Sequence, residues 1–462
     1  MPRLSLADPA RFWLTAAWFA LLALCGGASR ADEPSQALVR IGALLVLAIS
    51  LWSPRGDRLA RQRGFFLVAA IAVGLTVLQL VPLPPTVWAA LPGRAFYADL
   101  AATAGVPDAW RPVSVAPDLT LDSLLGLLAP LATLVAVASV AQRDRRALMV
   151  LVLALGLTSA VVGLAQLTDV VPPFYLVATP DAAIGLFANR NHQAVFLAGV
   201  LALLTAIAPG LSSSREWRRS EPAITSAVAL FLLVTIVVVG SRAGLLTGGV
   251  ALVAGAVIYT RAREDARASP RAEERSSAGA KPWLIGLLAV GLGGGAVALA
   301  LFRSQAVALD RLIAGGEEVR AERLGTLFDM AWAFMPFGSG LGTFTPAYLR
   351  FEPDDQLKLS YANQAHNEPA QLLIEGGLAG GALLLLLVGW WAWRSIAIWR
   401  PGVSGSEATA ARAGSFVLGI ALLASLADYP LRTPLFAGIA IIAAVLMGAR
   451  RSVSVASPAK FT

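Results

Sequence analysis

The chain alternates between long apolar stretches and short polar connections. A helix needs about 20 mostly apolar residues to cross roughly 30 Å of hydrocarbon. The pattern therefore predicts an all-α polytopic integral membrane protein with about twelve transmembrane helices. We place them near residues 11–29, 38–53, 64–82, 120–141, 146–167, 193–209, 222–240, 243–260, 282–302, 371–393, 413–427 and 433–449.

The composition agrees with this pattern. Apolar residues make up 57% of the chain and charged residues only 14%, and the mean hydropathy is +0.68. Soluble domains have roughly 45–50% apolar and 25% charged residues, so a soluble enzyme and a disordered protein are excluded. The single cysteine, Cys25, excludes a disulfide framework and a cysteine-based metal site. With only two histidines, we expect no metal and no cofactor.

The net charge of +8 by itself would suggest a nucleic-acid partner. When the charges are placed on the predicted spans, however, 24 of the 37 basic residues fall on the side of the N-terminus. That side carries a net +14 and the other side −6. Lys and Arg in short loops mark the cytoplasmic side of a membrane protein. We therefore predict that both termini are cytoplasmic, and we expect the lipid bilayer rather than nucleic acid as a partner.

The predicted organisation is one membrane domain with a large outer loop. Residues 1–302 hold transmembrane helices 1–9, residues 303–370 form the loop, and residues 371–462 hold helices 10–12 and a cytoplasmic tail. Within the loop, the apolar periodicity of LGTLFDMAWAF predicts an amphipathic helix on the outer membrane surface. The glycines of FGSGLGTF do not follow a strand, so they indicate a tight turn rather than a dinucleotide site.

Two polar clusters on the predicted outer face are candidates for chemistry. Asn189, Arg190, Asn191 and His192 precede the sixth span, where they form either a capped helix start or the rim of a substrate cavity. Arg242 lies in the very short connection between spans seven and eight. Helix N–H groups beside a guanidinium suit a phosphate, although an arginine that extends to the lipid headgroups would also explain this position.

Two further clusters lie near the last spans. His366 and Asn367 close the large loop, directly before span ten, and imidazole is the side chain best suited to accept a proton near neutral pH. A lone histidine is more often structural, but this one lies on the same predicted side as Arg242. The last cluster, residues 428–432 (DYPLR), fills a short turn, and an ion-paired turn would account for it.

Five sequence segments resemble one protein family when they are taken together and in order. They are GLFANRNHQAVFLAG, GSRAGLL, RLGTLFDMAWAFMPFGSGLGTF, AHNEPAQLLIEGGLAG and SLADYPLRTP. With the predicted topology, they resemble the O-antigen ligase and polysaccharide polymerase family of bacterial inner-membrane proteins. The resemblance covers roughly residues 105–445.

This resemblance implies a GT-C-like membrane glycosyltransferase with a large periplasmic loop. It implies a donor glycan on undecaprenyl pyrophosphate, an acceptor hydroxyl on a glycan, lipid A core or protein, and no metal. By motif, Arg242 and Arg323 would bind the donor pyrophosphate and His366 would be the catalytic base. Apart from the resemblance, the polar clusters make Arg190, Asn191, His192 and Asn367 candidates for the substrate cavity. The chain departs from the family at Glu368-Pro369 and at Phe328.

Two other functions stay open at this point. Many polytopic proteins are transporters, for example of a small anion such as bicarbonate, but transporters place ionisable groups near the midplane of broken helices. The predicted spans hold few such groups. A non-catalytic partner of a glycan export system is the other alternative. Ligase, polymerase and protein glycosyltransferase also remain equal possibilities.

Overall fold

The computed structural model describes residues 7–53, 56–211, 214–267, 318–354, 357 and 362–448. The protein is mostly helical, at 74%, and this confirms the predicted all-α class. Among the described residues the only strands are β1 (Pro82–Leu83) and β2 (Arg111–Pro112), which pair antiparallel. Eight described helices are long and apolar enough to cross a membrane, so the chain is a multi-pass membrane protein.

Eleven of the twelve predicted spans coincide with a helix, or with two consecutive helices, in the structure. The ninth, near residues 282–302, lies outside the described residues. The helices are α1 (Asp8–Cys25), α2 (Ser35–Trp52), α4 (Arg63–Gln79), α7 (Pro117–Gly126) with α8 (Leu128–Ser139), α9 (Arg145–Gln166), α10 (Arg190–Ile207), α11 (Arg215–Val239), α12 (Arg242–Arg267), α16 (Glu368–Trp399), α17 (Ser406–Ser425) and α18 (Pro434–Met447).

Local sequence sets where several of these helices begin and end. The Asn189 side chain caps α10 by accepting from the Asn191 amide at 2.8 Å, and Asn367 caps α16 by accepting from the Ala370 amide at 2.9 Å. Gly240 ends α11 with a φ of 66°, the left-handed conformation that glycine adopts without a steric penalty. Ser241 then accepts from the Gly244 amide at 3.0 Å, and α12 begins.

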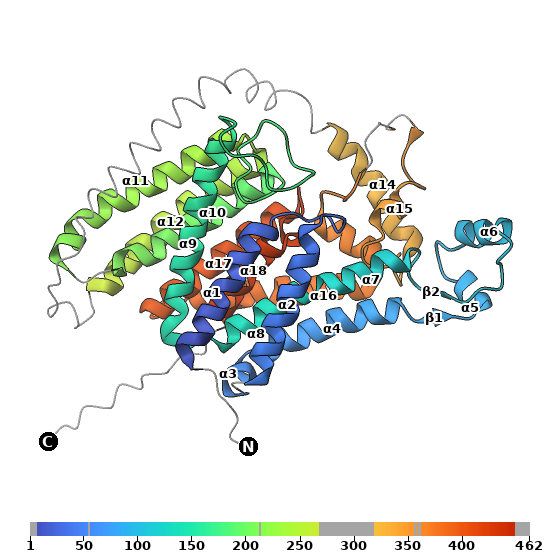
Figure 1. Cartoon of the computed structure of the whole chain (residues 1–462), viewed down its shortest axis with the longest axis horizontal. Helices are drawn as coiled ribbons and strands as arrows, with labels where there is room; N and C mark the ends of the chain where they lie inside the picture. The colour runs from blue at the N-terminus through green and yellow to red at the C-terminus, as the bar shows by residue number, and fades with distance from the viewer. Residues whose placement is uncertain are drawn as a thin grey trace.

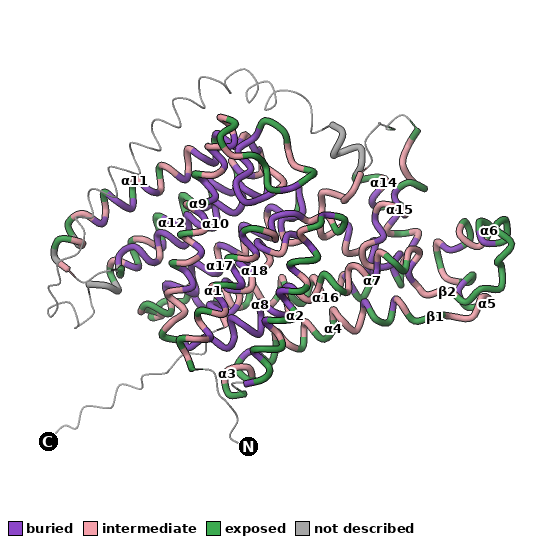
Figure 2. The backbone as a smooth tube through the Cα atoms, in the orientation of Figure 1, coloured by how far each residue is buried: buried purple, intermediate pink, exposed green. Residues whose placement is uncertain are grey.

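Helix α10 forms the centre of the bundle. It packs against α9, α11, α12 and α17 (Figure 1), and 83% of its apolar stretch is buried. The burial along the backbone is strongest in α10 and its neighbours, whereas α6 (Ala95–Thr103) is largely exposed (Figure 2). Lipid supplies no hydrophobic drive between helices, so close packing has to hold them together.

Helices α10 and α12 run parallel at close approach. A Cβ on Gly244 would lie 2.3 Å from the Ala194 Cβ, and one on Gly255 would lie 3.1 Å from the Thr205 Cγ2. Both contacts join residues fifty positions apart, so the two helices keep one register over three turns. Small residues at these positions allow the close contact, and the first turns of the two helices therefore lie at the same level.

The polar segments outside the spans form two further groups. Helices α5 (Pro85–Ala89) and α6 project from the bundle beyond the β1–β2 pair (Figure 1). Helix α14 (Glu318–Phe334) packs against α16 and is followed by α15 (Phe344–Tyr348). The loop helix predicted from LGTLFDMAWAF is therefore present as part of α14.

The glycine-rich segment after α14 is the tight turn that the sequence predicts. Gly338, Gly340 and Gly342 all have positive φ values, of 81°, 112° and 86°. The amides of Ser339 and Gly340 donate to the carbonyls of Ile374 and Glu375, at 2.8 and 3.0 Å. The turn is thereby fixed against the second turn of α16.

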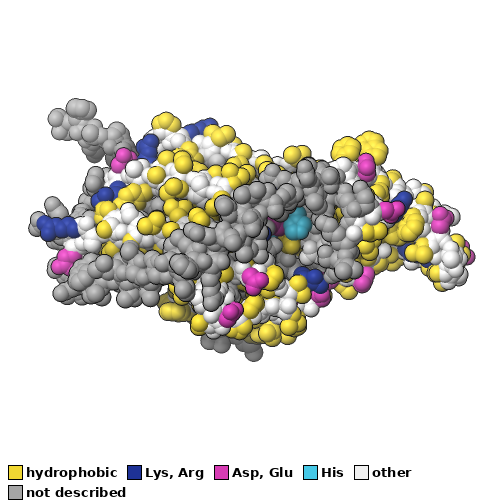
Figure 3. All heavy atoms as spheres, turned by 90° about the horizontal axis from the view of Figure 1, so that it is seen from above, with side chains coloured by type: hydrophobic (Ala, Val, Ile, Leu, Met, Phe, Trp, Pro, Cys, Tyr) yellow, Lys and Arg dark blue, Asp and Glu magenta, His cyan; other side chains and the backbone are white. Residues whose placement is uncertain are grey.

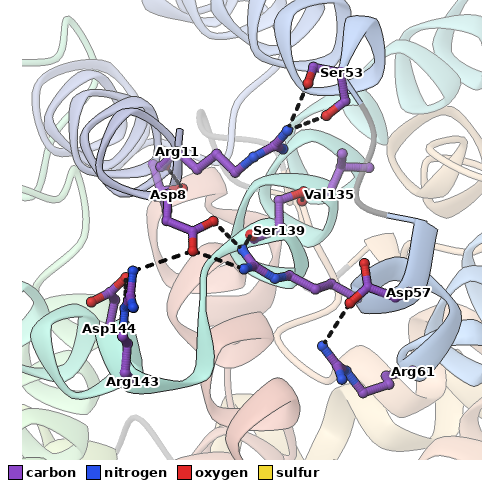
Figure 4. Close-up of polar contacts among 11 residues, drawn as sticks. Asp8, Arg11, Ser53, Asp57, Arg61, Val135, Ser139, Arg143 and Asp144 are labelled. Carbon is purple, nitrogen blue, oxygen red and sulfur yellow. Dashed lines mark hydrogen bonds and ion pairs between the residues drawn. The ribbon is translucent and has the colours of Figure 1, made fainter. Parts of the chain in front are cut away.

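The bundle has two polar ends that differ in chemistry. At one end, which we call the Asp8 end, Asp8 contacts Arg58 and Arg143, and Arg11 contacts Ser53 (Figure 4). The other, the Asp428 end, is built from the starts of α10, α12 and α16 and the turn between α17 and α18. At this end the Leu435 amide donates to the Gly26 carbonyl at 2.9 Å, which joins the end of α1 to the start of α18.

Candidate active site

The first turn of α10 brings one histidine into the interior. The Asn189 cap holds this turn in place, and the His192 side chain is 1% exposed. Its ring makes edge contacts with the rings of Phe187 and Tyr429, at centroid distances of 6.5 and 5.0 Å. His192 therefore lies behind the surface of the Asp428 end, in an aromatic environment.

The second histidine stands at the entrance to α16. His366 has a φ of 51°, an uncommon conformation for a residue other than glycine. The next residue, Asn367, caps α16, and its side-chain nitrogen Nδ2 also donates to the Leu426 carbonyl at 3.2 Å. That hydrogen bond ties the start of α16 to the end of α17, and the His366 side chain remains 30% exposed.

One carboxylate joins the two histidines. Oδ1 of Asp428 lies 3.3 Å from His366 Nδ1 and 3.6 Å from His192 Nε2. Oδ2 accepts from the side-chain nitrogen Nδ2 of Asn191 at 2.6 Å, and Oδ1 also accepts from the Tyr429 backbone amide at 2.9 Å. The turn after α17 therefore connects the starts of α10 and α16 through a single side chain.

Asp428 is ionised despite its burial. Its side chain is 1% exposed, and burial alone raises the pKa of a carboxyl group. The close approach of His192 and His366 outweighs that effect and lowers the pKa of Asp428 below its ordinary value. The carboxylate therefore stays negative throughout the pH range in which an imidazole titrates.

Tyr429 fixes the two imidazole rings relative to each other. Its ring contacts both of them, with centroids 5.0 Å from His192 and 4.9 Å from His366. Burial and the neighbouring charge of Asp428 raise the pKa of the phenol, which is hydrogen-bonded to the side chains of Asn363 and Asn189. Tyr429 is thus neutral near pH 7 and acts as a packing and hydrogen-bonding group.

Two further carboxylates, both on α16, lie beside this centre. Glu375 accepts from the Phe344 amide at 3.1 Å and from the Gln371 side chain at 2.9 Å, and it lies 3.5 Å from Arg432. Glu368 accepts from the Ser425 hydroxyl. These contacts fix α16 to the loop after α14 and to α17, so they hold His366 in place.

Arg242 is the first residue of α12 and is partly buried. Because α10 and α12 keep a register of fifty positions, Arg242 lies at the level of His192 on a neighbouring helix. The structure thus brings Arg242 to the same end of the bundle as both histidines. Ser241 caps α12, so the first backbone N–H groups of that helix lie at the same level as His192.

The other predicted site residues are placed less completely. Arg323 lies on α14, but its side chain is outside the described part of the structure. Arg190 begins α10, and its backbone amide faces the Thr179 hydroxyl at 3.4 Å. Asn191 donates to Asp428, and Asn367 caps α16 next to His366.

The central role of Asp428 is not apparent from the sequence. An ion-paired turn is the expectation for residues 428–432, whereas Asp428 contacts the two histidines and Arg432 contacts Glu375. A useful signal was available, because an acidic residue in a very short connection on the predicted outer face has to find a partner. Nothing in the sequence showed that the partners were histidines.

The centre is accessible from outside through one of its two histidines. His366 is 30% exposed and His192 only 1%, and one face of the molecule shows a histidine side chain at the surface with an acidic side chain beside it (Figure 3). With Nδ1 directed at Asp428, His366 leaves Nε2 as the nitrogen that can meet a substrate. A carboxylate behind an imidazole is an arrangement that supports general base catalysis.

Comparison with known proteins finds a family match for part of the chain. Residues 227–399 match the family model described as O-antigen ligase, and this confirms the resemblance that the sequence segments indicate. The matched region contains Arg242, Arg323 and His366, whereas His192 and Asp428 lie on either side of it. A comparison with curated protein sequences finds no match.

Proposed function

We propose that this O-antigen ligase-related membrane protein is a glycosyltransferase of the bacterial inner membrane, with its active site on the periplasmic side. It transfers a glycan from an undecaprenyl-pyrophosphate donor to an acceptor hydroxyl. The observation that carries the proposal is the pairing of His366 with buried, ionised Asp428 at the bundle end where Arg242 also lies. The family match supports the same reaction class.

His366 is the proposed general base. Asp428 holds a proton on Nδ1, so that Nε2 accepts the proton of the acceptor hydroxyl. The hydroxyl oxygen then attacks the anomeric carbon, and the bond from that carbon to the pyrophosphate oxygen breaks. The electron pair leaves with the lipid pyrophosphate, while Asp428 stabilises the imidazolium. A single displacement of this kind inverts the anomeric centre.

The leaving group is the second requirement of the reaction. A lipid pyrophosphate leaves readily once its growing negative charge is stabilised, and Arg242 with the first amides of α12 is suited to that task. Arg323, on the helix that packs against α16, is the proposed second arginine. Alignment of two bulky lipid-held substrates would supply a further large part of the rate enhancement.

The transporter alternative has less support. Two carboxylates of the described spans are buried, Glu221 in α11 and Glu375 in α16, and both lie near the starts of their helices. Glu221 is held by Tyr259, Thr225 and Arg263. These are paired groups near helix starts rather than a relay across the membrane centre, where a transporter places its ionisable residues.

The test replaces His366 and Arg242 by alanine and follows glycan transfer in cells that lack the native gene. We expect both variants to lose transfer at normal protein levels, with accumulation of lipid-linked glycan. Asp8→Asn, at the other end of the bundle, is the matched control and should retain full transfer. Full activity of His366→Ala would refute the proposed site. The accumulated product also distinguishes a polymerase, a lipid A core ligase and a protein transferase.

A further inference from the structure

The chain has two histidines, and both lie against the same carboxylate oxygen. We propose that His192 is a positioning residue that shares Asp428 with His366 and thereby sets the lowest pH at which His366 can accept a proton. The inference rests on the proposed function of His366, but the coupling of the two histidines can be measured without any activity.

The geometry makes the two imidazoles compete. Asp428 Oδ2 is occupied by Asn191, and Oδ1 already accepts from the Tyr429 amide at 2.9 Å. Both imidazole nitrogens therefore approach the one remaining region of Oδ1, at 3.3 and 3.6 Å. A single carboxylate can balance one imidazolium, but two would leave a buried excess positive charge, which is costly.

Burial distinguishes the two histidines. His192 is 1% exposed and His366 is 30% exposed, so His366 is the one that a substrate can reach. Neither ring nitrogen of His192 makes a hydrogen bond within the described structure, so its position is fixed by packing against Phe187 and Tyr429. His192 is therefore a second imidazole that packing holds against Asp428, the carboxylate partner of His366.

Further titratable and charged groups surround the pair. Among the described residues, they are one phenol, two glutamates and three arginines. They are Tyr429 in the turn, Glu368 and Glu375 of α16, Arg432 of the short helix η5 (Pro430–Arg432), Arg190 of α10 and Arg242 of α12. Burial raises the pKa of Glu368 to about 7, so this glutamate also changes its charge as the pH falls from 8 to 5. Glu368 is present in both the wild type and His192→Gln, so the difference between their titrations reports the two histidines.

The consequence for the reaction has a definite sign. A proton on either histidine disfavours a proton on the other, because their positive charges share one compensating carboxylate. In the wild type, this repulsion keeps His366 unprotonated to a lower pH. When His192 is removed, Asp428 serves His366 alone, and the proton is held on His366 at a higher pH. The acid limb of activity then moves upward.

The experiment uses the full chain, purified in detergent with a histidine-free tag and labelled with carbon-13 only at histidine. Two ring signals are expected, and His366→Gln and His192→Gln assign them. In the wild type we expect each signal to report both protonation steps. In His192→Gln, the His366 signal should titrate in one step, with its midpoint higher by about half to one pH unit. Phe187→Leu, which disturbs the packing of His192 but keeps its imidazole, should leave the wild-type behaviour intact.

The pH profile of glycan transfer provides the second measurement. His192→Gln should move the acid limb upward by the same amount, while a purely structural role would lower the rate equally at every pH. An unchanged His366 titration in His192→Gln would overturn the inference. Coupled titrations together with a fully active His366→Ala would instead overturn the proposed function and leave the coupling standing, so the two failures can be told apart.

Discussion

The two ends of the bundle are each organised around one aspartate that has two cationic or potentially cationic partners. At the Asp8 end, Arg58 forms a two-point contact with Asp8, at 2.9 and 3.1 Å, and Arg143 lies 3.4 Å away (Figure 4). At the Asp428 end, the partners are His366 and His192, at 3.3 and 3.6 Å. The geometry is similar, but the chemistry of the partners is different.

The difference lies in what each end can do with a proton. Arginine is charged at every physiological pH, so the Asp8 end is a permanent ion-pair network whose role is to fix α1, α3 (Gly56–Arg61) and the end of α8. Histidine changes its charge near neutral pH, so the Asp428 end can accept and release a proton. Burial also differs, since the Asp8 side chain is 21% exposed and the Asp428 side chain 1%.

The largest effect should come from removing the charge of Asp428. In Asp428→Asn, His366 loses the carboxylate that orients it and stabilises its protonated form. We expect glycan transfer to fall by about 10²–10⁴-fold, the range that general acid–base catalysis supplies. The measurement is the transfer rate in membranes with equal protein levels. Because the pKa of Asp428 is lowered, the acid limb of the wild type does not report protonation of Asp428.

The Asp8 end provides the contrast for this result. Asp8→Asn is the same chemical change at an aspartate with permanently charged partners, so transfer should remain within a factor of two of the wild type. Equal losses of activity in the two variants would mean that both aspartates act through folding alone. In that case the proposed division between a structural end and a catalytic end would be wrong.

The membrane-spanning helices that carry these two ends are largely predictable from the sequence. Long apolar stretches must become helices in lipid, because their backbone groups have no water to bind, and eleven of the twelve predicted spans coincide with helices. It also places Arg242, His192 and His366 on one side, because topology alone decides this. Helix starts at Asn189, Ser241 and Asn367 follow from the capping chemistry of their side chains.

The partners of Asp428 could not be predicted in the same way. Asn191 and Asp428 are 237 positions apart in the chain, and their contact depends on which helices pack against α10. That choice rests on the fit of small residues such as Gly244 against Ala194, and many glycines and alanines of this chain could provide such a fit. The sequence showed a polar turn with opposite charges at its ends, and the nearest pairing, Asp428 with Arg432, was the natural but wrong expectation.

A smaller effect is expected from the ring that contacts the two histidines. Tyr429→Leu removes the aromatic contacts to both imidazoles, and each such contact contributes about 0.5–1.5 kcal/mol. We expect transfer to fall by about 3–10-fold, without a change in protein level. Tyr429→Phe keeps the ring and loses only the hydroxyl bonds, so it should stay near the wild-type rate. If both variants are equally impaired, the hydroxyl rather than the ring positions the histidines.

The smallest effect on activity is expected at the Asp8 end, where the change should appear in stability instead. Asp8→Asn breaks the two-point contact with Arg58 and the contact with Arg143, and it removes a negative charge from the first turn of α1. Since these side chains are partly exposed, the loss should be about 1 kcal/mol. It is measured as a lower midpoint of thermal unfolding in detergent, and it should shrink in high salt because the interaction is screened. A salt-independent loss would indicate that Asp8 acts through its hydrogen bonds and packing, and the contrast with Asp428 would then rest on proton transfer alone.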